Sequence, residues 1–145
     1  MENRDMQDSK FGSPSADANA TPHRISPQEA SERLTAGYTY LDVRTEEEFA
    51  EGHPAGSVNV PFAIMSDGVM TPNPEFLEAV NARFAKDAKL VVGCRSGGRS
   101  LRAARALLEA GFTDVVDQRA GWDGARDPFG QLTEPGWSRV GLPAE

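Results

Sequence analysis

The chain has little of several residue types that particular chemistries require. Among its 145 residues there are one cysteine and two histidines. No internal disulfide can therefore form, and no thiolate-rich zinc site can be assembled. Positive charge is also scarce, because 15 basic residues stand against 22 acidic ones and the net charge is −7. Such a protein repels nucleic acid and anionic membranes, so we expect neither as a partner, and we expect no metal and no other cofactor.

Long apolar runs are missing as well. No stretch of the sequence reaches the length of a membrane-spanning helix, and residues 1–20 lack the apolar core of a secretory signal. The same residues carry four acidic side chains, which transit peptides avoid. These absences predict a soluble, cytoplasmic protein. Residues 1–22 are polar and aperiodic and predict a flexible tail, whereas residues 23–145 predict one domain.

Residues 23–145 alternate between strand patterns and helix patterns. Two capping boxes, Ser26 with Glu29 and Thr45 with Glu48, mark the starts of helices. Further helices are predicted from residue 74 and after residue 100, and strands over residues 38–43, 57–60, 90–92 and 115–116. This alternation indicates an α/β sheet with helices on both faces and with ligands bound at the carboxyl ends of its strands.

The strand pattern Leu90–Val92 is continuously apolar, which is typical of a central strand covered on both faces. Residues 62–73 contain several turn formers and predict a loop. From residue 120 onward, glycines and prolines break every pattern. We expect residues 123–139 to lie on the surface, with a lid over the pocket as the alternative. Trp122 and Trp137 are expected to pack against the domain.

The only cysteine opens a loop between the apolar strand pattern and a helical pattern, with the sequence Cys94-Arg95-Ser96-Gly97-Gly98-Arg99-Ser100. Two glycines let the backbone curl so that several N–H groups point at one spot, and the following helix directs its positive end there. Two arginines add full positive charge. These surroundings favour the ionised form of a thiol, so the loop predicts an anionic sulfur. The alternative is that Cys94 is a small buried hydrophobic residue, the role of most lone cysteines.

This loop and a segment upstream of it resemble the rhodanese-like sulfurtransferases, in particular the small single-domain type. The upstream segment is similar to the family's DVR motif and to the motifs that follow it, here Leu41-Asp42-Val43-Arg44, Glu48-Phe49, Gly52-His53-Pro54-Ala55-Gly56-Ser57 and Asn59-Val60-Pro61. The segment from Cys94 to Ser100 is similar to the family's active-site loop. The resemblance implies a rhodanese-like α/β fold, with a central, mainly parallel five-stranded sheet and helices on both faces.

The resemblance also implies a sulfurtransferase that works in two steps. The Cys94 thiolate attacks the outer sulfur of a small anionic donor such as thiosulfate, sulfite leaves, and the persulfide gives its sulfur to an acceptor such as cyanide or a thiol. Backbone N–H groups of residues 95–100 are expected to hold the terminal sulfur. The substrate-binding residues expected are Arg95, Ser96, Gly97, Gly98, Arg99 and Ser100. Either arginine is a candidate for the sulfonate end of the donor, whereas Asp42, Arg44 and His53 are interpreted as structural.

Three alternatives remain at this point. The domain could be a non-catalytic docking module, although such modules often lose the cysteine. It could instead be a carrier that passes the persulfide to a protein partner. A cysteine phosphatase or an arsenate reductase is disfavoured by counting, because phosphatase loops of this kind place one more residue between cysteine and arginine than the four that separate Cys94 from Arg99.

Overall fold

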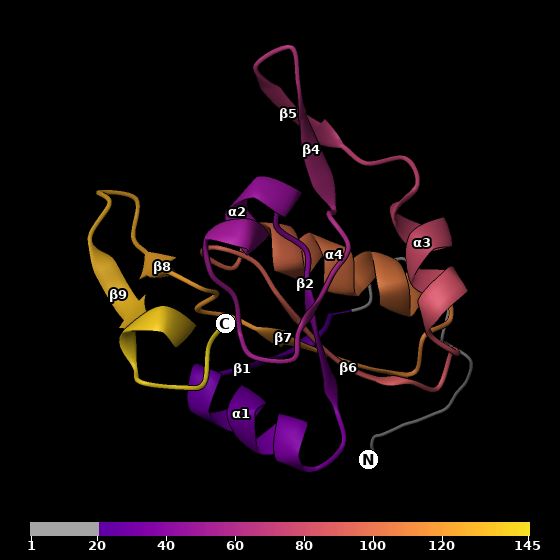
Figure 1. Ribbon diagram of the computed structural model, residues 1–145, viewed down its shortest axis with the longest axis horizontal. Helices are drawn as coiled ribbons and strands as arrows, with labels where there is room; N and C mark the ends of the chain where they lie inside the picture. The colour runs from indigo at the N-terminus through magenta and orange to yellow at the C-terminus, as the bar shows by residue number, and fades with distance from the viewer. Residues whose placement is uncertain (1–20) are drawn as a thin grey trace.

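The computed structural model describes residues 21–145, which contain a five-stranded sheet with the strand order β1-β7-β6-β2-β3 (Figure 1). All four pairings within this sheet are parallel. The strands are β1 (His23–Ile25), β7 (Asp114–Gln118), β6 (Lys89–Gly93), β2 (Thr39–Asp42) and β3 (Val58–Asn59). Strand β6 is central and buried from Leu90 onward, as its apolar run predicts. The prediction of an α/β fold with a parallel five-stranded sheet is confirmed.

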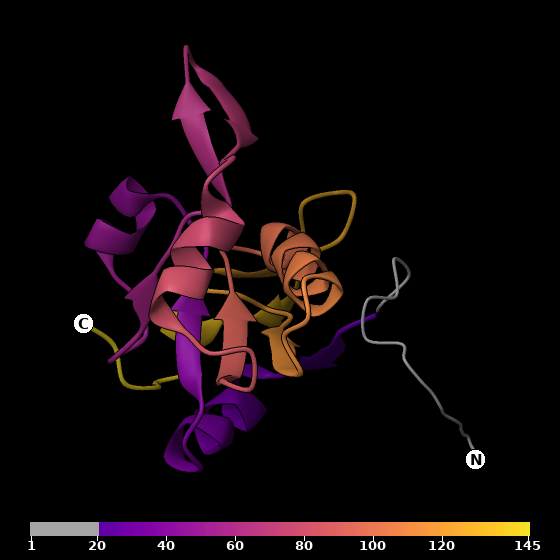
Figure 2. The same ribbon diagram turned by 90° about the vertical axis from the view of Figure 1, so that its right-hand side faces the viewer.

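Helices cover both faces of the sheet (Figures 1 and 2). Helix α1 (Pro27–Thr35) lies on one face, where Ala30 packs in a cluster with Tyr40 and Val91. Helices α3 (Phe76–Arg83) and α4 (Gly98–Glu109) lie on the other face, which holds the larger apolar cluster. The short helix α2 (Glu46–Glu51) follows β2. Alternate residues of each central strand thus point into different halves of the core.

Both predicted capping boxes are present. The Ser26 hydroxyl accepts a hydrogen bond from the backbone N–H of Glu29, and the Glu29 carboxylate accepts one from the backbone N–H of Ser26. Thr45 and Glu48 make the same exchange at the start of α2. These bonds satisfy backbone donors that a helix leaves free in its first turn, which explains why both helices begin where the sequence predicts.

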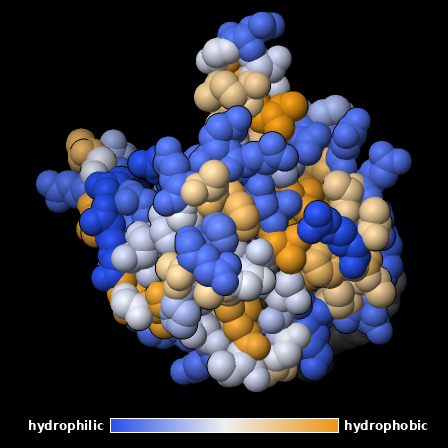
Figure 3. All heavy atoms as spheres, viewed as in Figure 1, coloured by the Kyte–Doolittle hydropathy of each residue, from blue (hydrophilic) through white to orange (hydrophobic). Residues whose placement is uncertain are grey.

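Residues 62–73 form a hairpin instead of the loop predicted for them. Its strands are β4 (Ala63–Ser66) and β5 (Val69–Pro72), and it projects from the body of the molecule (Figures 1 and 2). Asp67 and Gly68 both have positive φ, 52° and 78°, as a two-residue hairpin turn requires. An Asp-Gly pair is a recognised signal for such a turn, and it explains why the segment pairs as two strands. The hairpin leaves the side chains of Ile64, Met65, Val69 and Met70 at the surface (Figure 3).

The chain after residue 120 is ordered around a second hairpin, formed by β8 (Gly124–Arg126) and β9 (Leu132–Pro135). A turn of 3-10 helix, η1 (Trp137–Arg139), follows. Trp137 is 1% exposed, contacts Tyr40 edge-on at 5.5 Å, and donates a hydrogen bond from Nε1 to the Pro143 carbonyl oxygen. The expectation that Trp137 packs in the core is confirmed. Trp122 is partly buried, packs against the same apolar cluster as expected, and lies beside the cysteine loop.

Two expectations concern the ends and the surroundings of the chain. The flexible tail predicted over residues 1–22 falls almost wholly outside the described residues, which begin at Thr21. Within residues 21–145, no helix combines the length and the apolar composition needed to cross a bilayer.

Candidate active site

The cysteine loop lies at the carboxyl end of β6, the middle strand of the sheet. Cys94 directly follows Gly93, the last residue of β6, and α4 begins at Gly98. Gly97 has a φ of 103°, and a Cβ at this position would collide with the carbonyl oxygen of Arg119. Because only glycine fits there, the chain turns from strand to helix within a few residues. The turn brings the first N–H groups of α4 close to the cysteine.

The sulfur of Cys94 has polar neighbours. The backbone N–H of Gly97 donates to Sγ over 3.1 Å, and the Ser100 hydroxyl oxygen lies 3.5 Å from Sγ. The residue is 2% exposed, and part of it packs in the apolar cluster beneath α4. Burial alone fits the alternative of a hydrophobic core residue. The backbone N–H aimed at Sγ and the start of a helix beside it set Cys94 apart from such a residue.

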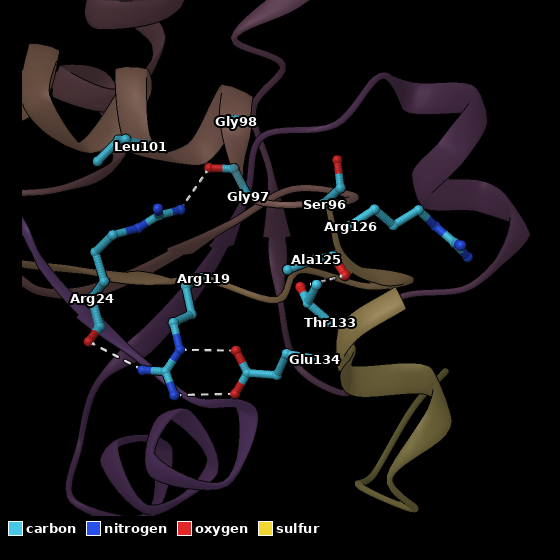
Figure 4. Close-up of a pocket in the computed structure, with 10 residues that line it drawn as sticks. All are labelled: Arg24, Ser96, Gly97, Gly98, Leu101, Arg119, Ala125, Arg126, Thr133 and Glu134. Atoms are coloured by element: carbon cyan, nitrogen blue, oxygen red, sulfur yellow. Dashed lines mark hydrogen bonds and ion pairs between the residues drawn. The ribbon is translucent and has the colours of Figure 1, made fainter. Parts of the chain in front are cut away.

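The loop above the sulfur, in contrast, is at the surface. Arg95, Ser96 and Gly98 are exposed, whereas Gly97 and Ser100 are buried. Ser96, Gly97 and Gly98 also border a cavity of about 600 Å³ between the loop and the β8–β9 hairpin (Figure 4). Cys94 itself does not line this cavity.

The two arginines of the loop have different surroundings. Arg99 makes a two-pronged ion pair with Glu48 of α2, with N–O distances of 2.7 and 3.0 Å. Burial opposes ionisation of Glu48, but hydrogen bonds from Arg99 and from the Thr45 backbone outweigh it and lower the pKa of Glu48 to about 2. The hydrogen bonds that Arg99 donates to Glu48 also raise the pKa of Arg99. Arg99 thus ties α2 to the start of α4.

Arg95 is exposed, and its side chain has no hydrogen-bond or ion-pair partner among residues 21–145. It borders a cavity of about 150 Å³ that is also lined by Trp122, Glu48 and Arg44. The sequence leaves open which arginine faces a ligand. The geometry leaves Arg95 available and Arg99 occupied.

The upstream motif forms a buried network next to the loop. Arg44 pairs with Asp42 over 2.8 Å, both side chains are 3% exposed or less, and Arg44 also donates to the Gly52 carbonyl oxygen. The Asn59 amide donates to the backbone carbonyls of Asp42 and Arg44. His53 hydrogen-bonds through Nδ1 with the backbone carbonyl of residue 49. These contacts hold the carboxyl ends of β2 and β3 together, in keeping with the structural interpretation of the motif.

The segment after β7 also shapes the loop, and no sequence signal pointed to it. Trp122 donates a backbone hydrogen bond to the Cys94 carbonyl oxygen over 2.8 Å, and Asp123 donates one to the Arg95 carbonyl oxygen over 2.9 Å. Gly121 has a φ of 68°, and a Cβ there would lie 2.6 Å from the Cys94 carbonyl oxygen. The close approach of two backbones at this point fixes the outer side of the loop.

With this geometry established, comparison with known proteins decides the family. The model of the rhodanese-like domain matches residues 26–127. The chain belongs to the rhodanese-like domain family. The rhodanese-like fold predicted from the cysteine loop and the upstream motif is thereby confirmed. The matched region includes β8 and ends before β9 begins.

Individual relatives of this rhodanese-like domain agree. "Thiosulfate sulfurtransferase 16, chloroplastic" from Arabidopsis thaliana is 40% identical over 130 residues, which are 90% of this chain and 98% of the relative. "Rhodanese-like domain-containing protein 15, chloroplastic" from the same plant is 40% identical over 111 residues, 77% of this chain and 61% of the relative. The crystal structure of Rv0390 from M. tuberculosis has a TM-score of 0.72 at 33% identity and covers 87% of this chain and 98% of its own. Together they support sulfur transfer as the general activity.

The comparison corrects the predicted location. Both Arabidopsis relatives carry the word chloroplastic in their names. The prediction of a cytoplasmic rhodanese-like protein is therefore wrong, because these names point to a plastid. The prediction was drawn only from what the sequence lacks, and no positive feature of the chain specified the compartment.

Proposed function

We propose that this rhodanese-like domain is a thiosulfate sulfurtransferase that carries sulfur on Cys94. In the first step the Cys94 thiolate attacks the outer sulfur of thiosulfate, a sulfur–sulfur bond of the donor breaks, and sulfite leaves with the bonding electrons. In the second step a nucleophile such as cyanide or a thiol takes the outer sulfur and regenerates the thiolate. The observation that carries the proposal is the Gly97 N–H aimed at Sγ at the start of α4.

The loop offers a physical reason for a stable persulfide. The extra sulfur carries negative charge, which a purely apolar pocket would disfavour. The Gly97 N–H and the Ser100 hydroxyl are already at Sγ, and the helix behind them contributes partial positive charge. Ser96 and Gly98 supply further backbone N–H groups of the same loop.

We assign the sulfonate end of the donor to Arg95. This guanidinium is exposed and unpaired within residues 21–145, whereas Arg99 is held by Glu48. The same pairing argues against a phosphatase or an arsenate reductase. Those enzymes need the arginine at the end of the loop to bind an oxyanion, and here that arginine already has a carboxylate on both prongs.

The proposal is tested by thiocyanate formation from thiosulfate and cyanide, with purified protein and no partner present. We expect turnover by the natural chain, and none by Cys94→Ser, whose unfolding free energy should stay within ~1 kcal/mol of the natural one. Hydrolysis of an aryl phosphate or reduction of arsenate without thiocyanate formation would favour the phosphatase class. Sulfur uptake without turnover would favour the carrier for a protein acceptor.

A further inference from the structure

One buried carboxylate lies next to the loop and has no part in the chemistry described so far. Asp117, on β7, is 0% exposed. One of its oxygens, Oδ2, accepts a hydrogen bond from Nε of Arg24 over 2.6 Å. The other, Oδ1, has no hydrogen-bond partner among the described residues. Burying a carboxylate this incompletely satisfied is costly, so the position calls for an explanation.

Asp117 is linked to the sulfur through Arg24. While Nε of Arg24 donates to Asp117, its terminal nitrogen Nη2 donates to the carbonyl oxygen of Gly97 over 2.8 Å, as Figure 4 shows for the second contact. Gly97 is the residue whose N–H donates to Sγ of Cys94. The Asp117 carboxylate therefore orients the Arg24 guanidinium. The guanidinium in turn holds Gly97, which donates a hydrogen bond to the sulfur.

A second link runs through Ser100. Its hydroxyl oxygen lies 3.5 Å from Sγ of Cys94 and 3.3 Å from the Gly97 carbonyl oxygen. Burial raises the pKa of the Asp117 carboxyl, and the Ser100 hydroxyl and the Arg24 guanidinium beside it act in the opposite direction. Ser100 thus contacts both the sulfur and the Gly97 carbonyl that Arg24 binds.

We propose that Asp117 is a positioning residue for Cys94: through Arg24 it holds Gly97, whose backbone N–H donates to the sulfur. The inference rests on the proposed function and adds residues from β1 and β7 to the loop. The Arg24 link fixes the carbonyl side of Gly97, and this restrains the residue whose N–H faces the sulfur.

A merely structural role is the competing explanation, since the Arg24–Asp117 pair also joins β1 to β7. A structural role affects how much protein is folded, but leaves the turnover of each folded molecule unchanged. A positioning role lowers kcat for each active molecule. It leaves the KM for thiosulfate nearly unchanged, because the donor's sulfonate is assigned to Arg95 on the exposed side of the loop.

The test compares Asp117→Asn with Asp114→Asn in the full chain. Asp114 is a matched control because it lies at the other end of β7, where it accepts a hydrogen bond from the Tyr38 hydroxyl. The rate of thiocyanate formation is divided by the number of molecules that take up sulfur. That number is measured by intact mass after incubation with thiosulfate. We expect Asp117→Asn to lower kcat about tenfold, the effect of losing one hydrogen bond to a charged group, with KM changed less than twofold. Asp114→Asn should change neither.

Two further variants decide the matter if Asp117→Asn does not fold. Arg24→Gln alters a side chain that is 37% exposed and should lower kcat similarly. Arg24→Lys keeps the charge but lacks the fork that spans two acceptors, so it should not restore kcat. Unchanged or increased kcat in folded Asp117→Asn or Arg24→Gln overturns the inference and leaves the proposed function intact. Failure of the natural chain to take up sulfur overturns the proposed function instead.

Discussion

Replacing Glu48 with Gln tests how the structure holds the loop arginine in place. The substitution keeps the shape of the side chain and one acceptor oxygen, and it removes the charge that pairs with Arg99. Both partners are largely buried, since their side chains are 21% and 15% exposed. The pair also joins α2 to the first turn of α4, two elements 51 residues apart in the sequence. Its loss should therefore be visible in global stability.

The magnitude follows from the pKa of Glu48. The fall from 4.5 to about 2 would correspond to ~3 kcal/mol of stability at neutral pH if the site were fully shielded. Water reaches part of the pair, and screening reduces the expected value to ~1–2 kcal/mol. Because the folded-state pKa is the lower one, this contribution is fully present above pH 4.5 and is lost as the pH falls toward 2.

Urea denaturation of the natural chain and of Glu48→Gln, at several pH values between 7 and 3, measures this difference. The gap in unfolding free energy should be ~1–2 kcal/mol at pH 7 and should narrow below pH 4.5. Glu47→Gln is the matched control, because Glu47 lies on the same helix, carries the same charge and is exposed. The reasoning is refuted by equal stability at pH 7, or by a gap that does not change down to pH 3.

Two more predictions concern the loop. Arg95→Gln should raise the KM for thiosulfate about tenfold and leave kcat within twofold, because it removes a charged hydrogen-bond donor to the sulfonate. Steady-state kinetics checks this, with Arg102→Gln on α4 as the exposed control. An unchanged KM for Arg95→Gln removes Arg95 from the donor site. Gly121→Ala should lower the unfolding free energy by at least ~2 kcal/mol, because the added Cβ would lie 2.6 Å from the Cys94 carbonyl oxygen. Gly68 has a similar φ and open space around it, so Gly68→Ala should lower the unfolding free energy by only ~1 kcal/mol. Equal losses in thermal or urea melts would show that the close packing at Gly121 does not matter.

Most of the helices and strands that the sequence predicts correctly are marked by short patterns of neighbouring residues. Capping boxes at Ser26 and Thr45 place two helices correctly, and the apolar run before Cys94 identifies the central strand. The hairpin at residues 63–72 differs from the loop that its turn formers predict, because the Asp67-Gly68 pair takes the two-residue hairpin turn and its flanking residues pair as strands. The β8–β9 hairpin has no comparable signal, since glycines and prolines interrupt both of its strands.

In the candidate site, too, the contiguous residues could be predicted from the sequence and the residues from other elements could not. The Cys94 loop is contiguous in the sequence, so its glycines, arginines and following helix could be recognised together. Its supports come from elsewhere: Glu48 from α2, Trp122 from the segment after β7, and Arg24 with Asp117 from two adjacent strands. Spacing along the chain does not encode which of these meet, because the order of the parallel strands brings them together. For that reason the sequence could name two candidate arginines and the geometry distinguishes them.

The central claim is that Cys94 carries a single extra sulfur atom. Intact-mass measurement after incubation with thiosulfate and removal of excess donor tests it most directly, followed by mapping of the modified peptide. We predict a gain of the mass of one sulfur atom on the peptide that contains Cys94, reversed by cyanide and absent from Cys94→Ser. An unchanged mass in the natural chain, or the same gain in Cys94→Ser, would contradict the account.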